Sequence, residues 1–279
     1  MTGMDKVRLA NTGSEATMHA AHRPRRTPTR VVHQVRRPVS RHVRLRALQH
    51  AGRHVGNHGP QGETRPIPTS RGIPRGIQEY LLTLPYNDIG AVERVFQRRG
   101  EQIAAVMVEP VMGNTAGIVP RLEWLQAIRR LCDAYGVVLI FDEVKTGFRL
   151  ANGGAQEYFG VKADLAAYAK AMGNGYPVAA IAGREAIMAP IDDGDVAHGG
   201  TYVGNVPATA AANATLEILE TEPIIETIFA RGKMLMDGIH EVLTRHDVPR
   251  GDRHPVHVQP GAGHRRAALR LPQLRCHRP

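Results

Sequence analysis

The sequence contains little cysteine, few aromatic residues and no long apolar run. Its 279 residues include two cysteines and one tryptophan, and 5% are aromatic, whereas 42% are hydrophobic and 22% charged. Two cysteines cannot form a disulfide framework, so we expect a reducing, cytoplasmic compartment. The longest aliphatic and aromatic run, 137–141, is far shorter than the roughly 20 residues of a membrane-spanning helix. The N-terminus lacks an apolar region after a basic start, which argues against a secretory signal.

Acidic residues are almost absent from two segments, 22–76 and 249–279. Together these segments hold 20 of the 36 Lys and Arg residues and 10 of the 14 His, but only 2 of the 26 Asp and Glu. The net charge of +10 therefore originates there, and the other 193 residues carry a net charge of −8. No helical or strand period persists in either segment for more than a few residues. We expect an irregular basic segment at 22–76 and an irregular basic tail at 249–279.

The remaining sequence alternates between strand-like and helix-like patterns. A turn at 11–15 leads into a helix, and small hydroxyl residues stand where its N-cap belongs. Apolar runs of buried-strand length alternate with amphipathic helical repeats, which is typical of an α/β domain with a mostly parallel sheet. The expected strands are 102–109, 137–141, 164–169 and 178–182, and the expected helices are 121–135, 184–189, 207–220 and 223–245.

Two opposite charges follow neighbouring candidate strands. Asp142 ends the strand at 137–141, and Lys170 ends the strand at 164–169. In open α/β sheets ligands bind at the carboxyl ends of the strands, so this pair suggests a binding site. The spacing alone is equally compatible with a surface Asp and a surface Lys at the starts of two loops.

Two hydroxyl-containing glycine turns are candidate phosphate sites. Thr12, Gly13 and Ser14 precede a helix, where backbone N–H groups and the positive end of the helix dipole converge. Thr201 lies in a second such turn, 199–205. Either turn taken alone is weak evidence, because Ser and Thr commonly only cap helices.

Six motifs occur in a fixed order along the chain. They are Asn-Thr-Gly-Ser-Glu-Ala (11–16), Val-Glu-Pro (108–110), Leu-Ile-Phe-Asp-Glu-Val-Lys-Thr-Gly-Phe-Arg (139–149), Gly-Gly-Ala-Gln-Glu-Tyr-Phe-Gly (153–160), Ala-Lys-Ala-Met-Gly-Asn-Gly-Tyr-Pro (169–177) and Gly-Gly-Thr-Tyr-Val-Gly-Asn (199–205). In combination and in this order, they resemble the motifs of the class III pyridoxal-phosphate aminotransferases, and most closely those of the glutamate-1-semialdehyde aminomutase group. The resemblance covers 1–21 and about 77–248, and implies a fold-type I large domain, amino-group transfer to or from a small amino or keto substrate, and a homodimer.

The resemblance implies a role for each residue around the cofactor ring. Lys170 would form the Schiff base with pyridoxal phosphate and later move the proton between substrate and cofactor. Asp142 would pair with the pyridine nitrogen and keep it protonated, and Val144 would pack on one face of the ring. Glu109 would contact substrate or cofactor, although a structural acid at a strand end is an equally good interpretation.

The resemblance also implies how the cofactor phosphate is held. Gly13 and Ser14 would bind it, beside Thr12, with help from Thr201. In this family the residue at the Thr201 position reaches the cofactor of the neighbouring subunit, which is the reason for expecting a homodimer.

Three parts of the family pattern are missing. The family has a further N-terminal region, an aromatic turn that should fall within 22–76, and a small C-terminal domain after 248. No Tyr, Phe or Trp occurs in 22–76. We hypothesise that 22 to about 71 and 249–279 are translated out of frame, which the other two reading frames of the gene would test. We expect weak or no turnover from such a chain.

The basic segments allow two other interpretations. Clustered arginines could bind nucleic acid without sequence specificity. However, 22–76 lacks the stacking aromatics typical of single-strand binders, and no helix-turn-helix or zinc-finger spacing occurs. His50, His54 and His58 would share a face of a helix and could bind a metal. Glycines at 52, 56 and 59 disfavour that helix, so we expect no metal site.

Overall fold

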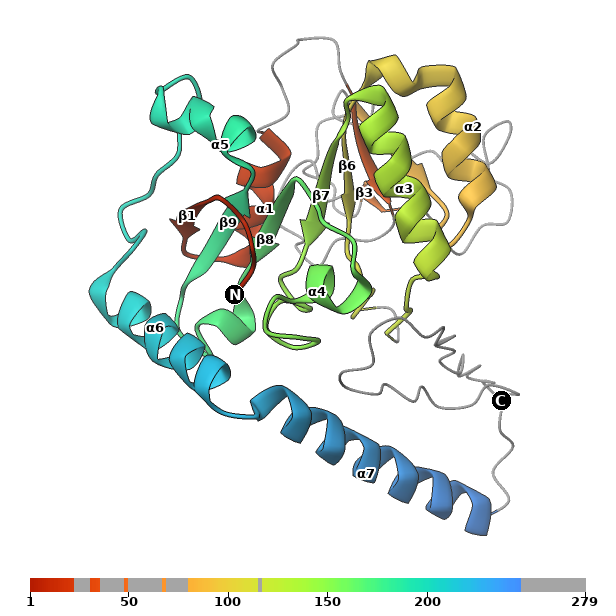
Figure 1. Ribbon diagram of the computed structural model, residues 1–279, viewed down its shortest axis with the longest axis vertical. Helices are drawn as coiled ribbons and strands as arrows, with labels where there is room; N and C mark the ends of the chain where they lie inside the picture. Colours follow the sequence, from red (N-terminus) through yellow and green to blue (C-terminus); the bar gives the residue numbers. More distant parts are fainter. Residues whose placement is uncertain (23–30, 36–47, 50–66, 69–79, 115–116, 247–279) are drawn as a thin grey trace.

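A computed structural model describes residues 1–22, 31–35, 48–49, 67–68, 80–114 and 117–246, and its centre is a twisted seven-stranded sheet (Figure 1). The strand order is β1-β9-β8-β7-β6-β2-β5. Neighbours from β8 to β5 are parallel, whereas β9 is antiparallel to both β8 and β1. The bounds are β1 (Lys6–Ala10), β2 (Val31–Val35), β5 (Leu81–Leu84), β6 (Ile103–Val108), β7 (Val138–Asp142), β8 (Leu165–Tyr168) and β9 (Ala179–Gly183), and β3 (Leu48–Gln49) pairs separately with β4 (Ile67–Pro68).

Helices cover both faces of this sheet. One buried cluster joins alternate strand residues to α2 and α3, and a second joins the intervening strand residues to α1 and α5. This is the layered α/β architecture expected from the sequence. The helices are α1 (Gly13–His22), α2 (Ile89–Arg99), α3 (Leu122–Tyr135), α4 (Ala155–Phe159), α5 (Glu185–Asp192), α6 (Val206–Thr221) and α7 (Ile224–Arg245), with short 3-10 turns η3 (Gly100–Gln102) and η4 (Lys170–Met172).

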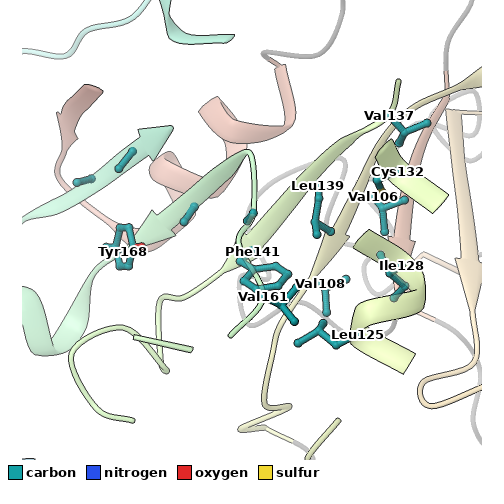
Figure 2. Packing of buried hydrophobic residues seen from close by; sticks show 14 of the residues in the cluster. Val106, Val108, Leu125, Ile128, Cys132, Val137, Leu139, Phe141, Val161 and Tyr168 are labelled. Atoms are coloured by element: carbon teal, nitrogen blue, oxygen red, sulfur yellow. The ribbon is translucent and has the colours of Figure 1, made fainter. Parts of the chain in front are cut away.

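The central strands are held by apolar packing against α3, which Figure 2 shows at close range. Leu125 and Ile128 of this helix are fully buried against the β6 and β7 side of the sheet. Gly136 ends the helix in the left-handed conformation at φ +63°, which a glycine adopts without steric cost. The strands and helices expected between 102 and 245 are confirmed, with bounds that differ by up to three residues.

The segment 22–76 was expected to be irregular, but it contains strand β2 and the short strands β3 and β4. Val31–Val35 forms strand β2, whose backbone pairs in parallel with β5 and with β6. Three of its five residues are valine, which favours extended structure. Apart from His22, β2, β3 and β4, both basic segments lie outside the described residues, including His50, His54 and His58.

The last described helix, α7, projects away from the sheet (Figure 1). Ile225 near its start is buried, but its side chains from 230 to 242 are exposed. No helix in the described ranges combines the length and apolar content needed to cross a membrane.

Candidate functional site

The sheet register brings four chain segments to one edge. Asp142, the last residue of β7, is the register partner of Ala167 in the parallel strand β8, and Lys170 follows that strand directly. Because β9 is antiparallel to β8 and β1, the end of β1 also reaches this edge, where Ala10 pairs with Ala179. The turn that opens α1 follows Ala10 and therefore joins the ends of β6, β7 and β8.

A cavity of about 200 Å³ lies at this edge. It brings together six of the residues that the motifs single out: Thr12, Gly13, Ser14, Asp142, Val144 and Lys170. The other residues that line it are Asn11, Ala169, Tyr176 and Val178.

Asp142 is the acidic residue of the cavity lining, and only 1% of its surface is exposed. Its Oδ1 atom accepts a hydrogen bond from the backbone N–H of Val144 at 3.2 Å. This contact fixes the orientation of the carboxylate. Asp142 therefore provides an oriented hydrogen-bond acceptor in a cavity lining that is mostly apolar by area.

Lys170 lies on the turn η4 with a positive φ of 48°, a strained conformation for a residue with a side chain. Its carbonyl accepts from the backbone N–H groups of Gly173 and Asn174 at 3.1 and 2.8 Å, which holds the turn in place. Partial burial and the neighbouring Lys145 ammonium lower the pKa of Lys170, and Asp142 and Glu109 oppose this shift. A lysine with a lowered pKa has a larger neutral fraction and is a better nucleophile.

The turn before α1 is closed by two side-chain hydrogen bonds, one of them the N-cap bond of Thr12. Thr12 Oγ1 accepts from the backbone N–H of Glu15 at 3.2 Å, and Glu15 Oε2 accepts from that of Asn11 at 2.7 Å. A Cβ atom at Gly13 would lie 2.8 and 2.9 Å from the two methyl carbons of Val144, so any other residue there would force Val144 or the turn to move. The N-terminus of α1 therefore opens into the cavity, and the side chain of Val144 packs against the turn there. A helix N-terminus in this position is suited to binding an anionic group.

Glu109 follows β6 at the same edge, but it lies behind the cavity wall. It is 4% exposed and is absent from the cavity lining. Its Oε1 atom accepts from the backbone N–H of Gly113 at 3.2 Å, and its charge affects Lys170 and Tyr86 electrostatically. The geometry thus gives Glu109 a structural role in the 109–113 turn and an electrostatic influence on Lys170.

Thr201 is not brought into the cavity of its own chain. It is exposed on a turn at 201–204 that is connected to β1 through a hydrogen bond between His198 Nε2 and the Leu9 carbonyl at 2.7 Å. The expectation that Thr201 reaches a neighbouring subunit concerns a second chain and stays a prediction.

The cavity also contains residues that the motifs did not single out as functional, namely Asn11, Ala169, Tyr176 and Val178. Three of them lie inside quoted motifs, and Val178 directly follows one. These residues reach the cavity because β9 pairs antiparallel with both β1 and β8. No local sequence pattern predicts this pairing. Within the described part of the chain, no cluster of three or more His, Cys, Asp or Glu residues could hold a metal ion.

The chain is similar in sequence to known enzymes of one name. A glutamate-1-semialdehyde 2,1-aminomutase from Syntrophobacter fumaroxidans is 45% identical over 186 residues, covering 66% of this chain and 42% of that protein. The enzyme of the same name from Rhodopirellula baltica is 39% identical over 249 residues, covering 86% of this chain and 54% of that protein. The chain spans about half the length of these curated relatives.

Solved structures share the fold. An omega-transaminase from Sphaerobacter thermophilus superposes with a TM-score of 0.79 at 31% identity, covering 88% of this chain and 57% of that one. A transaminase solved with PLP bound gives a TM-score of 0.76 at 25% identity, covering 90% and 57%. The observed sheet and its flanking helices are therefore those of a PLP-dependent transaminase.

A model of the class III aminotransferase family matches residues 1–253, which is most of the sequence. The match includes both the turn at Thr12–Ser14 and the strand ends that carry Asp142 and Lys170. The chain belongs to the class III aminotransferase family.

Proposed function

We propose that this chain provides the cofactor-binding part of a pyridoxal-phosphate-dependent enzyme that transfers an amino group on a small amino or keto substrate, of the glutamate-1-semialdehyde aminomutase type. The observation that carries the proposal is the joint position of Lys170 and Asp142 in one cavity with the turn that opens α1. The cofactor-binding part comprises 1–21 and 77–248. We further propose that it acts in the cytoplasm as a homodimer, to whose neighbouring site Thr201 contributes.

The residues of the cavity fit the two ends of the cofactor. The turn at Gly13 and Ser14, beside Thr12, is the place for the phosphate, since an anion is stabilised at a helix N-terminus. The absence of a side chain at Gly13 leaves room there, because a Cβ atom would displace Val144. At the other end, the buried carboxylate of Asp142 would hold the protonated ring nitrogen, which has the opposite charge, and Val144 lines the same cavity.

Pyridoxal phosphate, when bound, supplies an electron sink for the negative charge that develops on the substrate carbon. Asp142 would keep the ring nitrogen protonated, since a carboxylate in a buried site favours a cationic partner. Lys170 would hold the cofactor through its amine and then, once released, move a proton at the substrate carbon. The lowered pKa of Lys170 supports both roles, because each of them requires a neutral amine.

We also propose that turnover of this chain is weak, because the segment 22–76, where the family resemblance places an aromatic turn, contains no Tyr, Phe or Trp. The cofactor site and the rate of turnover are therefore best tested separately, and cofactor attachment is the first test.

Purified protein is incubated with pyridoxal phosphate, reduced with borohydride and digested for mass spectrometry. The proposal predicts a visible absorption band that borohydride bleaches, and a cofactor-sized mass increase on Lys170. Lys170→Ala should lose both, whereas Lys162→Ala, which changes an exposed lysine before β8, should keep both. A cofactor adduct on another lysine with Lys170 unmodified would exclude the proposed site.

A further inference from the structure

A second lysine stands beside the cavity. Lys145 follows the cavity residue Val144, and its amine donates a hydrogen bond to Oδ1 of Asn114. Its stem passes over Gly113, where a Cβ atom would lie only 2.5 Å from Lys145 Cδ. Lys145 therefore connects the loop after β7 to the loop after β6, at the edge where the candidate site lies.

The positive charge of Lys145 is not neutralised by a carboxylate in the described structure. Its amine is bonded to the neutral amide of Asn114, and among the described residues no Asp or Glu lies within ion-pair distance of it. The side chain is partly exposed, so a solute could reach its ammonium group.

The charged groups that act on Lys170 in the described structure are Lys145, Asp142 and Glu109. Both carboxylates are almost completely buried, at 1% and 4% exposure, whereas Lys145 is partly exposed. A molecule that approaches Lys170 from solvent thus meets an accessible cation and two carboxylates that are shielded from it. This asymmetry favours an anionic group on the incoming molecule.

We propose that Lys145 binds the carboxylate of an anionic amino substrate and so makes the site selective for amino acids over simple amines. The inference rests on the proposed function, because it assigns the substrate class of the same site. An ammonium group has three donors, so Lys145 can bind a carboxylate and retain its bond to Asn114. Its flexible stem allows it to follow carboxylates at different distances from the amino group.

The proposal links carboxylate binding to the proton affinity of Lys170. Lys145 lowers the pKa of Lys170, so neutralising Lys145 with a bound carboxylate should raise that pKa. Removing the Lys145 charge by Lys145→Met should raise it in the same direction. A carboxylate should then have no further effect in the variant.

The first experiment needs no cofactor and uses the full chain. Competitive labelling with acetic anhydride, read by mass spectrometry, reports the pH midpoint of Lys170 reactivity with and without butyrate. We expect butyrate to raise the pH midpoint of Lys170 in the wild type and in Lys162→Met. In Lys145→Met the midpoint should already be raised without butyrate, and butyrate should not change it. An equal response of all three proteins, or none in the wild type, would overturn the proposal.

The second experiment measures selectivity in cofactor-loaded protein. The half-saturating concentration in a single-turnover half-reaction is compared for alanine, 4-aminobutyrate and butylamine. Lys145→Met should raise the half-saturating concentration about tenfold for at least one of the two amino acids and leave that of butylamine unchanged. Lys162→Met should leave all three half-saturating concentrations unchanged. Equal effects on amines and amino acids would contradict the proposal while leaving the cofactor site intact. Failure to load the cofactor would instead count against the proposed function, and the labelling experiment would still decide the role of Lys145.

Discussion

At the scale of single residues, two adjacent carboxyl groups at the end of β7 have different surroundings. Asp142 lines the cavity, whereas Glu143 is fully buried next to α4. Oε2 of Glu143 accepts from the backbone N–H of Ala155 at 2.5 Å and from Thr146 Oγ1 at 3.1 Å. These bonds attach the turn after Asp142 to the first residue of α4, so Glu143 helps to hold Asp142 in position.

Burial raises the pKa of Glu143 from 4.5 to about 7, although hydrogen bonds from Ala155, Thr146 and Gln156 counteract part of the effect. The folded protein therefore binds a proton that the unfolded chain releases near pH 4.5. The stability contributed by this proton is complete below that pH and is lost as pH rises towards 7.

We expect Glu143→Gln to remove this pH dependence, because the amide stays neutral. The free energy of unfolding of the wild type should fall relative to that of the variant by up to roughly 3 kcal/mol between pH 4.5 and 8. Urea denaturation at several pH values measures the difference, with Glu123→Gln on the exposed side of α3 as the control. Parallel pH curves for wild type and Glu143→Gln would show that folding does not raise the pKa of Glu143.

At the scale of elements, the turn before α1 and the loop after β7 depend on each other through Gly13 and Val144. We expect Gly13→Ala to move Val144 and to weaken cofactor binding about tenfold, which corresponds to about 1.4 kcal/mol. Helix formation should be preserved, because alanine is a good helix former. Titration of pyridoxal phosphate followed by visible absorbance measures the affinity.

Gly232→Ala is the matched control for this change, because a Cβ atom there meets nothing within 4 Å. Its cofactor affinity should equal that of the wild type. Unchanged affinity in Gly13→Ala as well would mean that this turn does not hold the phosphate.

The elements also show what could be predicted from sequence. β6 and β7 are continuous apolar runs, and their ends located Glu109 and Asp142 correctly at one edge of the sheet. β2 was not predicted, because its five residues are flanked by arginines and proline and are too few for a clear period. The antiparallel placement of β1 and β9 brings Asn11 and Tyr176 to the cavity, and such pairing between distant segments leaves no local pattern.

At the scale of the whole molecule, α7 carries apolar side chains that nothing in the described structure covers. Leu235 and Ile239 are 65% and 51% exposed, one helical turn apart. Exposed apolar surface of this kind favours association between molecules. We therefore expect the chain to form assemblies larger than a dimer as its concentration rises.

The double change Leu235→Glu and Ile239→Lys should reduce this higher-order association and alter the free energy of unfolding by no more than about 0.5 kcal/mol. The new pair has the favourable order for residues four apart on a helix. Sedimentation velocity over a concentration series measures the effect. Exchanging the charges of the Lys233 and Asp237 ion pair is the control, since it leaves the apolar surface unchanged, and equal association of all three proteins would contradict the expectation.

The whole molecule also shows how segments far apart in sequence make one site. The turn at 11–14 is more than a hundred residues from the end of β7 and from the turn after β8 in the sequence, yet all three line a single cavity. The family resemblance predicted which residues belong together, and the sheet register explains why they meet.

The central claim is that Lys170 and Asp142 face the same cofactor ring. The most direct test is a crystal structure of the protein after incubation with pyridoxal phosphate and reduction with borohydride. The account predicts continuous density from Lys170 Nζ to the cofactor, with an Asp142 oxygen within hydrogen-bond distance of the ring nitrogen. A cofactor bonded to a different lysine, or a ring nitrogen turned away from Asp142, would contradict it.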